Sequence, residues 1–330
     1  MKPLRLGTRG SRLALRQAES VARLIAERLP GVRVELVPVR TTGDAHRGPL
    51  TALGPTVGVF VKELQEALLR GEIDLAVHSA KDLPTASPEG LVVAAYPLRA
   101  DPRDALCGGR SLAELPPGAA VGTSSPRRAA QLRAARPDLN IVPLRGNVDT
   151  RLERVAGGEL DAAVLAAAGL ERLGLADRIR EMLDPDTVCP APAQGALAVE
   201  ARAGDEEALA VARALDDARV RRAVQAERSV LAALGGGCFL PLGALAEPAE
   251  PDGGDAPGSL PAPDGPLAGR EPRLRLRAAL AGPRSGAVVR VGAFSEPGEP
   301  PEAFGARVAR ALLERGAGPL LEEARASWGP

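Results

Sequence analysis

The chain repeats one local pattern three times, and this pattern strongly limits the fold. A β-type run is followed by a short turn of small polar residues and then by arginines that open a helical segment, at residues 8–12, 122–128 and 144–151. Strand, turn and helix in this order build α/β proteins. Helix N-termini present unpaired backbone N–H groups, and guanidinium groups beside them form sites for carboxylates or phosphates. The pattern predicts an α/β fold that binds a strongly anionic ligand.

The same alternation extends along most of the chain. β-type runs and helical patterns alternate, pause at residues 97–102 and then restart, which predicts two α/β units with largely parallel strand pairing. The predicted strands are 32–39, 73–77, 91–95, 119–122, 141–144 and 161–165, and the predicted helices are 12–28, 60–70, 127–136 and 148–156.

The C-terminal part has a different pattern and predicts a small α+β domain. An alanine-rich helix is expected at residues 222–234, and alternating runs predict strands at 274–280 and 287–291. Between them, residues 248–266 contain ten Pro or Gly out of nineteen. Such a composition cannot pack a core, so this stretch is interpreted as an exposed loop or insertion.

Composition narrows the class of ligand. The chain has 39 Arg and 3 Lys but a formal net charge of zero, and aromatic residues make up only 2%. Nucleic acid would require a broad basic surface with aromatic stacking platforms, so we expect no nucleic-acid partner. Discrete arginines in a balanced chain suit a compact polycarboxylate or phosphate.

Other classes of site are disfavoured as well. No apolar run is long enough to span a membrane and the N-terminus does not resemble a signal peptide, so we expect a cytoplasmic protein without membrane contact. The three cysteines show no C-x-x-C spacing and there are two histidines. We therefore expect neither a metal site nor a disulfide framework.

The arginine turns have a structural alternative. In residues 122–128, glycine and small hydroxyl residues would let the backbone approach a ligand, and Pro126 suits the first position of a helix. The alternative is a well-capped helix with solvated arginines. Ser11 is likewise a good N-cap, which leaves the role of Arg9 open, and the role of Arg145 and Arg151 is open on the same grounds.

The segment His78 to Pro84 follows the predicted strand 73–77. Ligands of open α/β sheets bind at the carboxyl ends of strands, so Lys81 and Asp82 are well placed for chemistry. A carboxylate in such a position can stabilise a developing cation or move a proton. The alternative is a surface turn before a proline. His78 is interpreted as a buried, hydrogen-bonded residue rather than a base.

Cys238 follows three consecutive glycines at the end of a predicted helix. Such a loop can flex or let another group pass close, so the thiol could be a nucleophile or an attachment point. The alternative is a buried structural cysteine. The residues alone do not identify the reaction.

In order and over essentially the whole chain, these segments resemble the porphobilinogen deaminases, also called hydroxymethylbilane synthases. Any one segment is only suggestive, but their joint order is highly specific. The matching segments are residues 8–11, 60–64, 78–84, 122–128, 144–151, 166–173, 194–195 and 236–238.

The resemblance implies a transferase of tetrapyrrole (haem and porphyrin) biosynthesis. Such enzymes join four porphobilinogen molecules head to tail, with loss of ammonia at each step, and release hydroxymethylbilane. Each pyrrole carries an acetate and a propionate, which bidentate guanidinium groups hold with fixed geometry. The family's cofactor is a dipyrromethane primer, joined by a thioether to the cysteine that matches Cys238.

The resemblance also implies roles for individual residues. Asp82 matches the catalytic aspartate. The residues implied in cofactor binding are Cys238, Lys81, Asp82, Thr123, Ser124, Ser125, Arg127, Arg128, Arg145 and Gly146. Those implied in substrate binding are Arg9, Ser11, Phe60, Arg151, Arg172, Gln194 and Gly195.

The implied fold is α/β, with two periplasmic-binding-protein-like domains flanking an active-site cleft and a small C-terminal α+β domain. The expected limits are 1–97 with 196–216 for the first domain, 98–195 for the second and 217–330 for the cofactor-bearing third, and we expect a monomer. The stretch 43–58 resembles the family's mobile lid. Two departures are the Val-Gly-Val sequence before Phe60 and the 248–266 insertion.

Two alternatives from other classes remain. A solute- or effector-binding module could use the same fold and arginines without chemistry, but it would not require Cys238 on a glycine loop. A phosphate-ester enzyme would also use arginine turns, but the sequence contains neither a P-loop nor a carboxylate cluster typical of a Mg²⁺ site.

Overall fold

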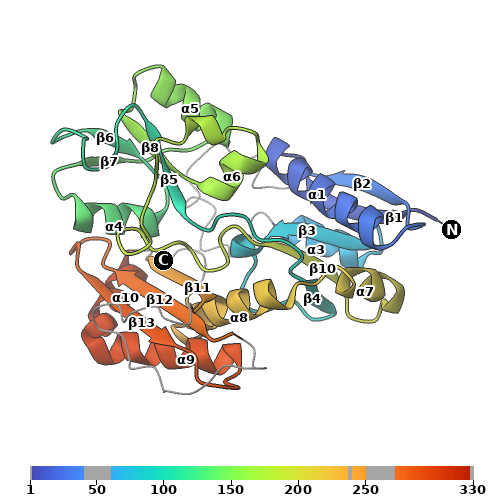
Figure 1. Cartoon of the computed structure of the whole chain (residues 1–330). Helices are drawn as coiled ribbons and strands as arrows, with labels where there is room; N and C mark the ends of the chain where they lie inside the picture. The colour runs from blue at the N-terminus through green and yellow to red at the C-terminus, as the bar shows by residue number, and fades with distance from the viewer. Residues whose placement is uncertain (1, 41–60, 237–239, 250–271, 328–330) are drawn as a thin grey trace. The chain divides into compact units, whose positions relative to one another are not determined.

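The computed structural model describes residues 2–40, 61–236, 240–249 and 272–327 (Figure 1). Backbone contacts divide the chain into two compact units. The first contains residues 1–101, 167–177 and 194–221, and the second contains 102–166, 178–193 and 222–330. In the described part of the chain, no helix is both long and apolar enough to cross a bilayer, and no cluster of three metal-binding side chains occurs.

The first unit is built on a mixed sheet with strand order β2-β1-β3-β10-β4 among the described residues. β2, β1 and β3 are parallel, whereas β10 pairs antiparallel with both β3 and β4. The strands are β1 (Leu4–Arg9), β2 (Val34–Val39), β3 (Leu75–Ser79), β4 (Leu91–Ala95) and β10 (Leu197–Arg202). Its helices are α1 (Arg12–Arg28), α3 (Lys62–Leu69), α6 (Ala167–Arg172) and α7 (Glu206–Arg213).

The core of the first unit lies between the sheet and its helices. In α1, the buried Ala18, Val21 and Ile25 follow the three- to four-residue spacing of one helix face. This face packs against Leu6 of β1 and Leu75 of β3. The packing fixes the carboxyl ends of β1 and β3, where predicted site residues lie.

The second unit contains a sheet of the same design, with order β7-β6-β8-β5-β9 among the described residues. β7, β6 and β8 are parallel, and β5 pairs antiparallel with β8 and β9. Its strands are β5 (Asp104–Gly108), β6 (Ala120–Gly122), β7 (Asn140–Val142), β8 (Ala162–Ala166) and β9 (Glu181–Met182), and its helices are α4 (Pro126–Ala135) and α5 (Val148–Ala156).

The C-terminal part of the second unit is an antiparallel sheet covered by helices (Figure 1). Phe304 is fully buried there in a core of small aliphatic side chains. The strands are β11 (Leu242–Pro248), β12 (Leu274–Ala281) and β13 (Val288–Phe294), and the helices are α8 (Ala218–Ala233), α9 (Pro301–Leu312) and α10 (Gly318–Ala326), with a π-helical turn (Leu313–Ala317) before α10.

The predicted α/β fold class with a small C-terminal α+β part is confirmed. Parallel pairing is found only among β2, β1 and β3 and among β7, β6 and β8, although four of the five described strands in each larger sheet run in the same direction. β10 and β5 each pair antiparallel with both of their neighbours. The predicted lid, and nearly all of the 248–266 insertion, lie outside the described residues.

Candidate functional site

Lys81 and Asp82 lie in a short 3₁₀ turn (Ala80–Asp82) directly after β3. β3 is buried almost throughout, so the turn begins where a rigid strand ends. Lys81 Nζ donates a hydrogen bond to Gln194 Oε1 at 3.2 Å. The half-buried Asp82 carboxylate has no hydrogen bond or ion pair with any described residue. A carboxylate without such partners can accept hydrogen bonds or an ion pair from a ligand.

Arg9 and Ser11 lie at the same edge of the sheet as this turn. Arg9 ends β1, which is the parallel neighbour of β3, so both strands have their carboxyl ends there. Ser11 is the N-cap of α1, and its hydroxyl accepts a hydrogen bond from the Ala14 N–H at 3.3 Å. Ser11 therefore caps α1, as the structural alternative in the sequence analysis predicted.

Gln194 and Gly195 are held from several sides within the first unit. Arg172 Nη2 donates to the Gly195 carbonyl at 2.6 Å, and Arg99 Nε donates to the Gln194 carbonyl at 3.2 Å. Burial lowers the pKa of Arg172 to about 10. A cation deprived of water in this way gains most from a bound anion.

His78 is a buried residue of β3. Its Nε2 lies 3.1 Å from Glu200 Oε2 on β10. Gln65 Nε2 donates to the same carboxylate at 3.0 Å. His78 is thus enclosed among side chains of its own unit, in agreement with its interpretation as a buried residue, but its Nε2 makes no hydrogen bond with a described residue, so the expected hydrogen bond is not observed there.

In the second unit, the turn between β6 and α4 is organised by its own hydroxyl groups. The Ser125 hydroxyl accepts from Arg128 N at 3.4 Å and caps α4, with Pro126 at the helix start. Ser124 Oγ donates to the Leu144 carbonyl at 2.8 Å and accepts from the Leu144 N–H at 3.0 Å. These contacts join the turns that follow β6 and β7, so two of the three arginine patterns lie side by side.

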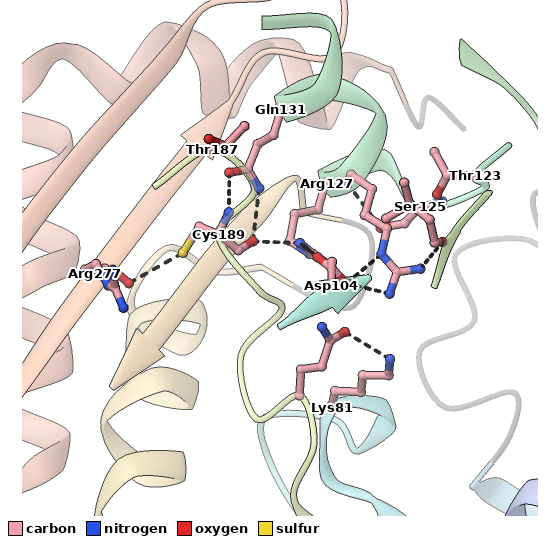
Figure 2. Close-up of polar contacts among 12 residues, drawn as sticks. Lys81, Asp104, Thr123, Ser125, Arg127, Gln131, Thr187, Cys189 and Arg277 are labelled. Atoms are coloured by element: carbon pink, nitrogen blue, oxygen red, sulfur yellow. Dashed lines mark hydrogen bonds and ion pairs between the residues drawn. The ribbon is translucent and has the colours of Figure 1, made fainter. Parts of the chain in front are cut away.

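Arg127 and Arg128 are buried and share one carboxylate, that of Asp104 at the start of β5 (Figure 2). Arg127 Nη1 lies 2.6 Å from Asp104 Oδ2 and 2.6 Å from the Cys189 carbonyl. Arg128 Nε lies 2.9 Å from Asp104 Oδ1, and its Nη1 donates to the Val164 carbonyl at 3.0 Å. The capped helix of the structural alternative is present, but these arginines are not solvated.

Gln131, one helical turn after Arg127, forms hydrogen bonds with the backbone of Cys189 (Figure 2). Its Oε1 accepts from Cys189 N at 2.8 Å and its Nε2 donates to the Cys189 carbonyl at 3.1 Å. The same segment contacts β12, where Cys189 Sγ lies 3.7 Å from the Arg277 carbonyl. Cys189 therefore contacts both α4 and the C-terminal sheet.

Arg145 and Arg151 flank the start of α5. Arg151 Nε donates to the Gly146 carbonyl at 2.8 Å, and Gly146 has a φ of 104°, which favours glycine. Burial, with the charges of Arg128 and Arg145, lowers the pKa of Arg151 to about 10. No described carboxylate pairs with Arg151. Arg128, Arg145 and Arg151, named here the arginine cluster, therefore form a cationic group suited to an anionic ligand.

Two predicted residues, Phe60 and Cys238, lie outside the described residues. Conversely, sequence reasoning missed Asp104, Gln131 and Cys189. One sequence signal could have identified Asp104. It is an acidic residue directly before the short apolar run 105–107, and the adjacent Arg127 and Arg128 require a counter-ion if they are buried.

Comparison with known proteins gives consistent similarities. A family model described as "Porphobilinogen deaminase, dipyromethane cofactor binding domain" matches residues 4–210. The chain is 48% identical to the porphobilinogen deaminase of Thermobifida fusca, covering 99% of this chain and 98% of that protein. It is 50% identical to the porphobilinogen deaminase of Mycolicibacterium paratuberculosis, covering 98% of each.

Among solved structures, the methionine-binding protein MetQ is similar over 66% of this chain and 91% of its own. The sequence identity is 16% and the TM-score 0.41, a likeness too low to support an argument.

Proposed function

The chain belongs to the porphobilinogen deaminase family, and we infer that it is the transferase that joins four porphobilinogen molecules head to tail into hydroxymethylbilane. Ammonia is lost at each addition, and the reaction belongs to tetrapyrrole biosynthesis. Every pyrrole brings an acetate and a propionate, so the bound chain is a polycarboxylate. The site must therefore hold many negative charges without binding anions indiscriminately.

The arginine cluster is the observation that most directly supports this function. Burial and the charges of Arg128 and Arg145 lower the pKa of Arg151, and Arg151 has no carboxylate partner among the described residues. A polycarboxylate would relieve this repulsion and form charge-assisted hydrogen bonds. The residues present thus fit a dipyrromethane and its substituents.

We propose that the dipyrromethane is joined to Cys238 through a thioether. When bound, it supplies a pyrrole with a free α-carbon as the primer for elongation. The residues proposed to hold it, besides Cys238, are Lys81, Asp82, Thr123, Ser124, Ser125, Arg127, Arg128, Arg145 and Gly146. Ser124 and Ser125 shape the turn that presents the arginines.

The incoming porphobilinogen is proposed to contact a second set of residues. Arg172 is the strongest member, since its pKa is lowered by burial and it is already oriented by the Gly195 carbonyl. Arg9 and Ser11 lie at the carboxyl end of β1, at the sheet edge of Asp82. The full set is Arg9, Ser11, Phe60, Arg151, Arg172, Gln194 and Gly195.

Asp82 is proposed as the catalytic residue. Departure of ammonia breaks the C–N bond of porphobilinogen and leaves an electron-poor methylene pyrrolenine cation. The Asp82 carboxylate, without a partner among the described residues, can stabilise this cation. A carbon–carbon bond then forms at the methylene and a proton leaves the pyrrole α-carbon, which Asp82 can accept.

The Asp82→Asn variant tests this proposal. It keeps the shape of the side chain but removes the charge, so we expect retained cofactor and substrate binding with a loss of turnover of roughly a hundredfold or more. Turnover is measured as porphobilinogen consumption. Asp177→Asn is the matched control, because Asp177 is an exposed aspartate in another 3₁₀ turn and should leave turnover unchanged. Near-wild-type turnover in Asp82→Asn would exclude the catalytic role.

We further propose that the protein is a cytoplasmic monomer. Its three domains are proposed to comprise residues 1–97 with 196–216, residues 98–195, and residues 217–330. The C-terminal sheet of the third domain supports this division, because its strands pair only with one another among the described residues. Size-exclusion chromatography with light scattering tests the oligomeric state.

A further inference from the structure

Asp104 draws together two side chains that a helix would otherwise separate. Arg127 and Arg128 are consecutive in α4, and neighbouring helical residues point about 100° apart because a turn contains 3.6 residues. Both guanidinium groups nevertheless converge on the Asp104 carboxylate, Arg127 at 2.6 Å and Arg128 Nη2 at 2.7 Å. Like charges do not converge without such a counter-ion.

We propose that Asp104 is a positioning residue for the anion site, whose carboxylate fixes the orientation of Arg127 and Arg128 and offsets one of their two charges. This inference rests on the proposed function, because it assumes that the arginines hold carboxylates of the pyrrole chain. Asp104 itself need not touch the ligand.

The contacts indicate how the orientation is fixed. Each oxygen of the carboxylate receives a different arginine, and each arginine has a second anchor, the Cys189 carbonyl for Arg127 and the Val164 carbonyl for Arg128. An arginine side chain carries about 2 kcal/mol of rotamer entropy. Because the protein has already ordered these two, little of that entropy remains to be lost when a ligand binds.

The charge balance supports the same role. Burial and the neighbouring Arg127 lower the pKa of Arg128, while Asp104 acts in the opposite direction. Removing one partner of a buried ion pair leaves an uncompensated charge, which is strongly unfavourable. Asp104 therefore favours the charged form of Arg128.

The test is the Asp104→Asn variant, compared with Asp74→Asn. Asp74 also lies between two arginines, with Arg5 at 2.6 Å and Arg202 at 3.5 Å, but it precedes β3 whereas Asp82 follows it. For both variants, kcat and KM for porphobilinogen are measured together with the urea midpoint of unfolding.

We expect both variants to lower the urea midpoint, but only Asp104→Asn to lower kcat/KM for porphobilinogen, by about tenfold, because Arg127 and Arg128 are proposed to hold the carboxylates of the covalent primer and a misplaced primer is a poorer acceptor. Asp74→Asn should leave kcat/KM within about twofold of the wild type, since Asp74 precedes β3 whereas Asp82 follows it. Equal kcat/KM values in the two variants would overturn the positioning role and leave Asp104 a structural ion pair.

Two further outcomes need separate treatment: a variant that does not fold, and a wild-type protein that is inactive. If Asp104→Asn does not fold, Asp104→Glu decides, because it keeps the charge but moves the carboxylate by one methylene. A lowered kcat/KM is then expected, and a wild-type kcat/KM would contradict the inference. If the wild-type protein itself does not consume porphobilinogen, the proposed function fails, whereas active wild type with unchanged variants refutes only the role of Asp104.

Discussion

The buried arginines show how a single residue type serves two purposes in this protein. Arg127 is enclosed by Asp104 and the Cys189 carbonyl, whereas Arg151 lacks a carboxylate partner among the described residues. In the first arrangement the guanidinium is oriented by protein groups before any ligand binds, and in the second the guanidinium has no carboxylate from the described residues to balance its charge. The two arginines differ in their ion-pair partners and not in residue type, so the sequence alone could not distinguish their roles.

The cysteines provide a prediction at the same scale. Burial raises the pKa of Cys107 to about 11 and that of Cys189 to about 12, so neither forms the reactive thiolate near pH 8. If Cys238 carries a thioether, the native wild-type protein should show no thiol that reacts rapidly with Ellman's reagent. After unfolding in guanidinium chloride, two thiols per chain should react.

The control for this titration is the protein without its cofactor. Cys238→Ser should also give two thiols after unfolding, because only Cys107 and Cys189 remain. Three reactive thiols in unfolded wild-type protein would show that Cys238 is free in that preparation and would contradict the thioether.

At the scale of single elements, strongly periodic segments could be predicted closely. The helix predicted at 12–28 has the bounds of α1, and the strand predicted at 91–95 has those of β4. The helix start follows from its serine cap and the length from the repeat of buried residues. β5 was missed because its apolar run is short and follows a segment with two prolines, although it supplies Asp104.

Gly195 provides a prediction for the segment that holds Lys81 and Arg172. Its φ is 85°, and a Cβ built there would lie 2.4 Å from the Ala100 carbonyl oxygen. We expect Gly195→Ala to lower the free energy of unfolding by about 3 kcal/mol, since backbone strain adds to a steric clash. Urea denaturation measures this change.

Gly118→Ala is the matched control. Gly118 has a similar φ of 79°, but no described residue other than its two chain neighbours has an atom within 4 Å of the position that its Cβ would take, so only the backbone strain applies. Its cost should be about 1 kcal/mol. Equal losses in the two variants would show that the close approach at Gly195 is relieved by a small shift of the chain.

At the scale of the whole molecule, the fold class could be predicted but the pairing of distant strands could not. Each larger sheet contains one antiparallel strand, β10 or β5, between strands that run in the opposite direction to it. Local periodicity indicates that a segment is a strand, but it carries no information about the partner, which is set by long-range packing. The family resemblance, rather than periodicity, indicated that the segment containing β10 returns to the first sheet.

The candidate site shows the same limit. Its turns and arginines could be identified from sequence, because a cap, a proline and clustered charges are local signals. The contacts of Gln194 with Lys81 and of Asp104 with Arg127 join residues 113 and 23 positions apart, and no local pattern predicts them. The roles of Phe60 and Cys238 rest on the resemblance alone.

The most direct test of the account is intact-protein mass spectrometry of the wild-type chain and Cys238→Ser, before and after addition of porphobilinogen. We predict a wild-type adduct equal to two pyrrole units that is lost in the variant and grows by single pyrrole steps with substrate. An unmodified wild-type chain that also gains no mass with porphobilinogen would contradict the account and favour a binding protein without chemistry.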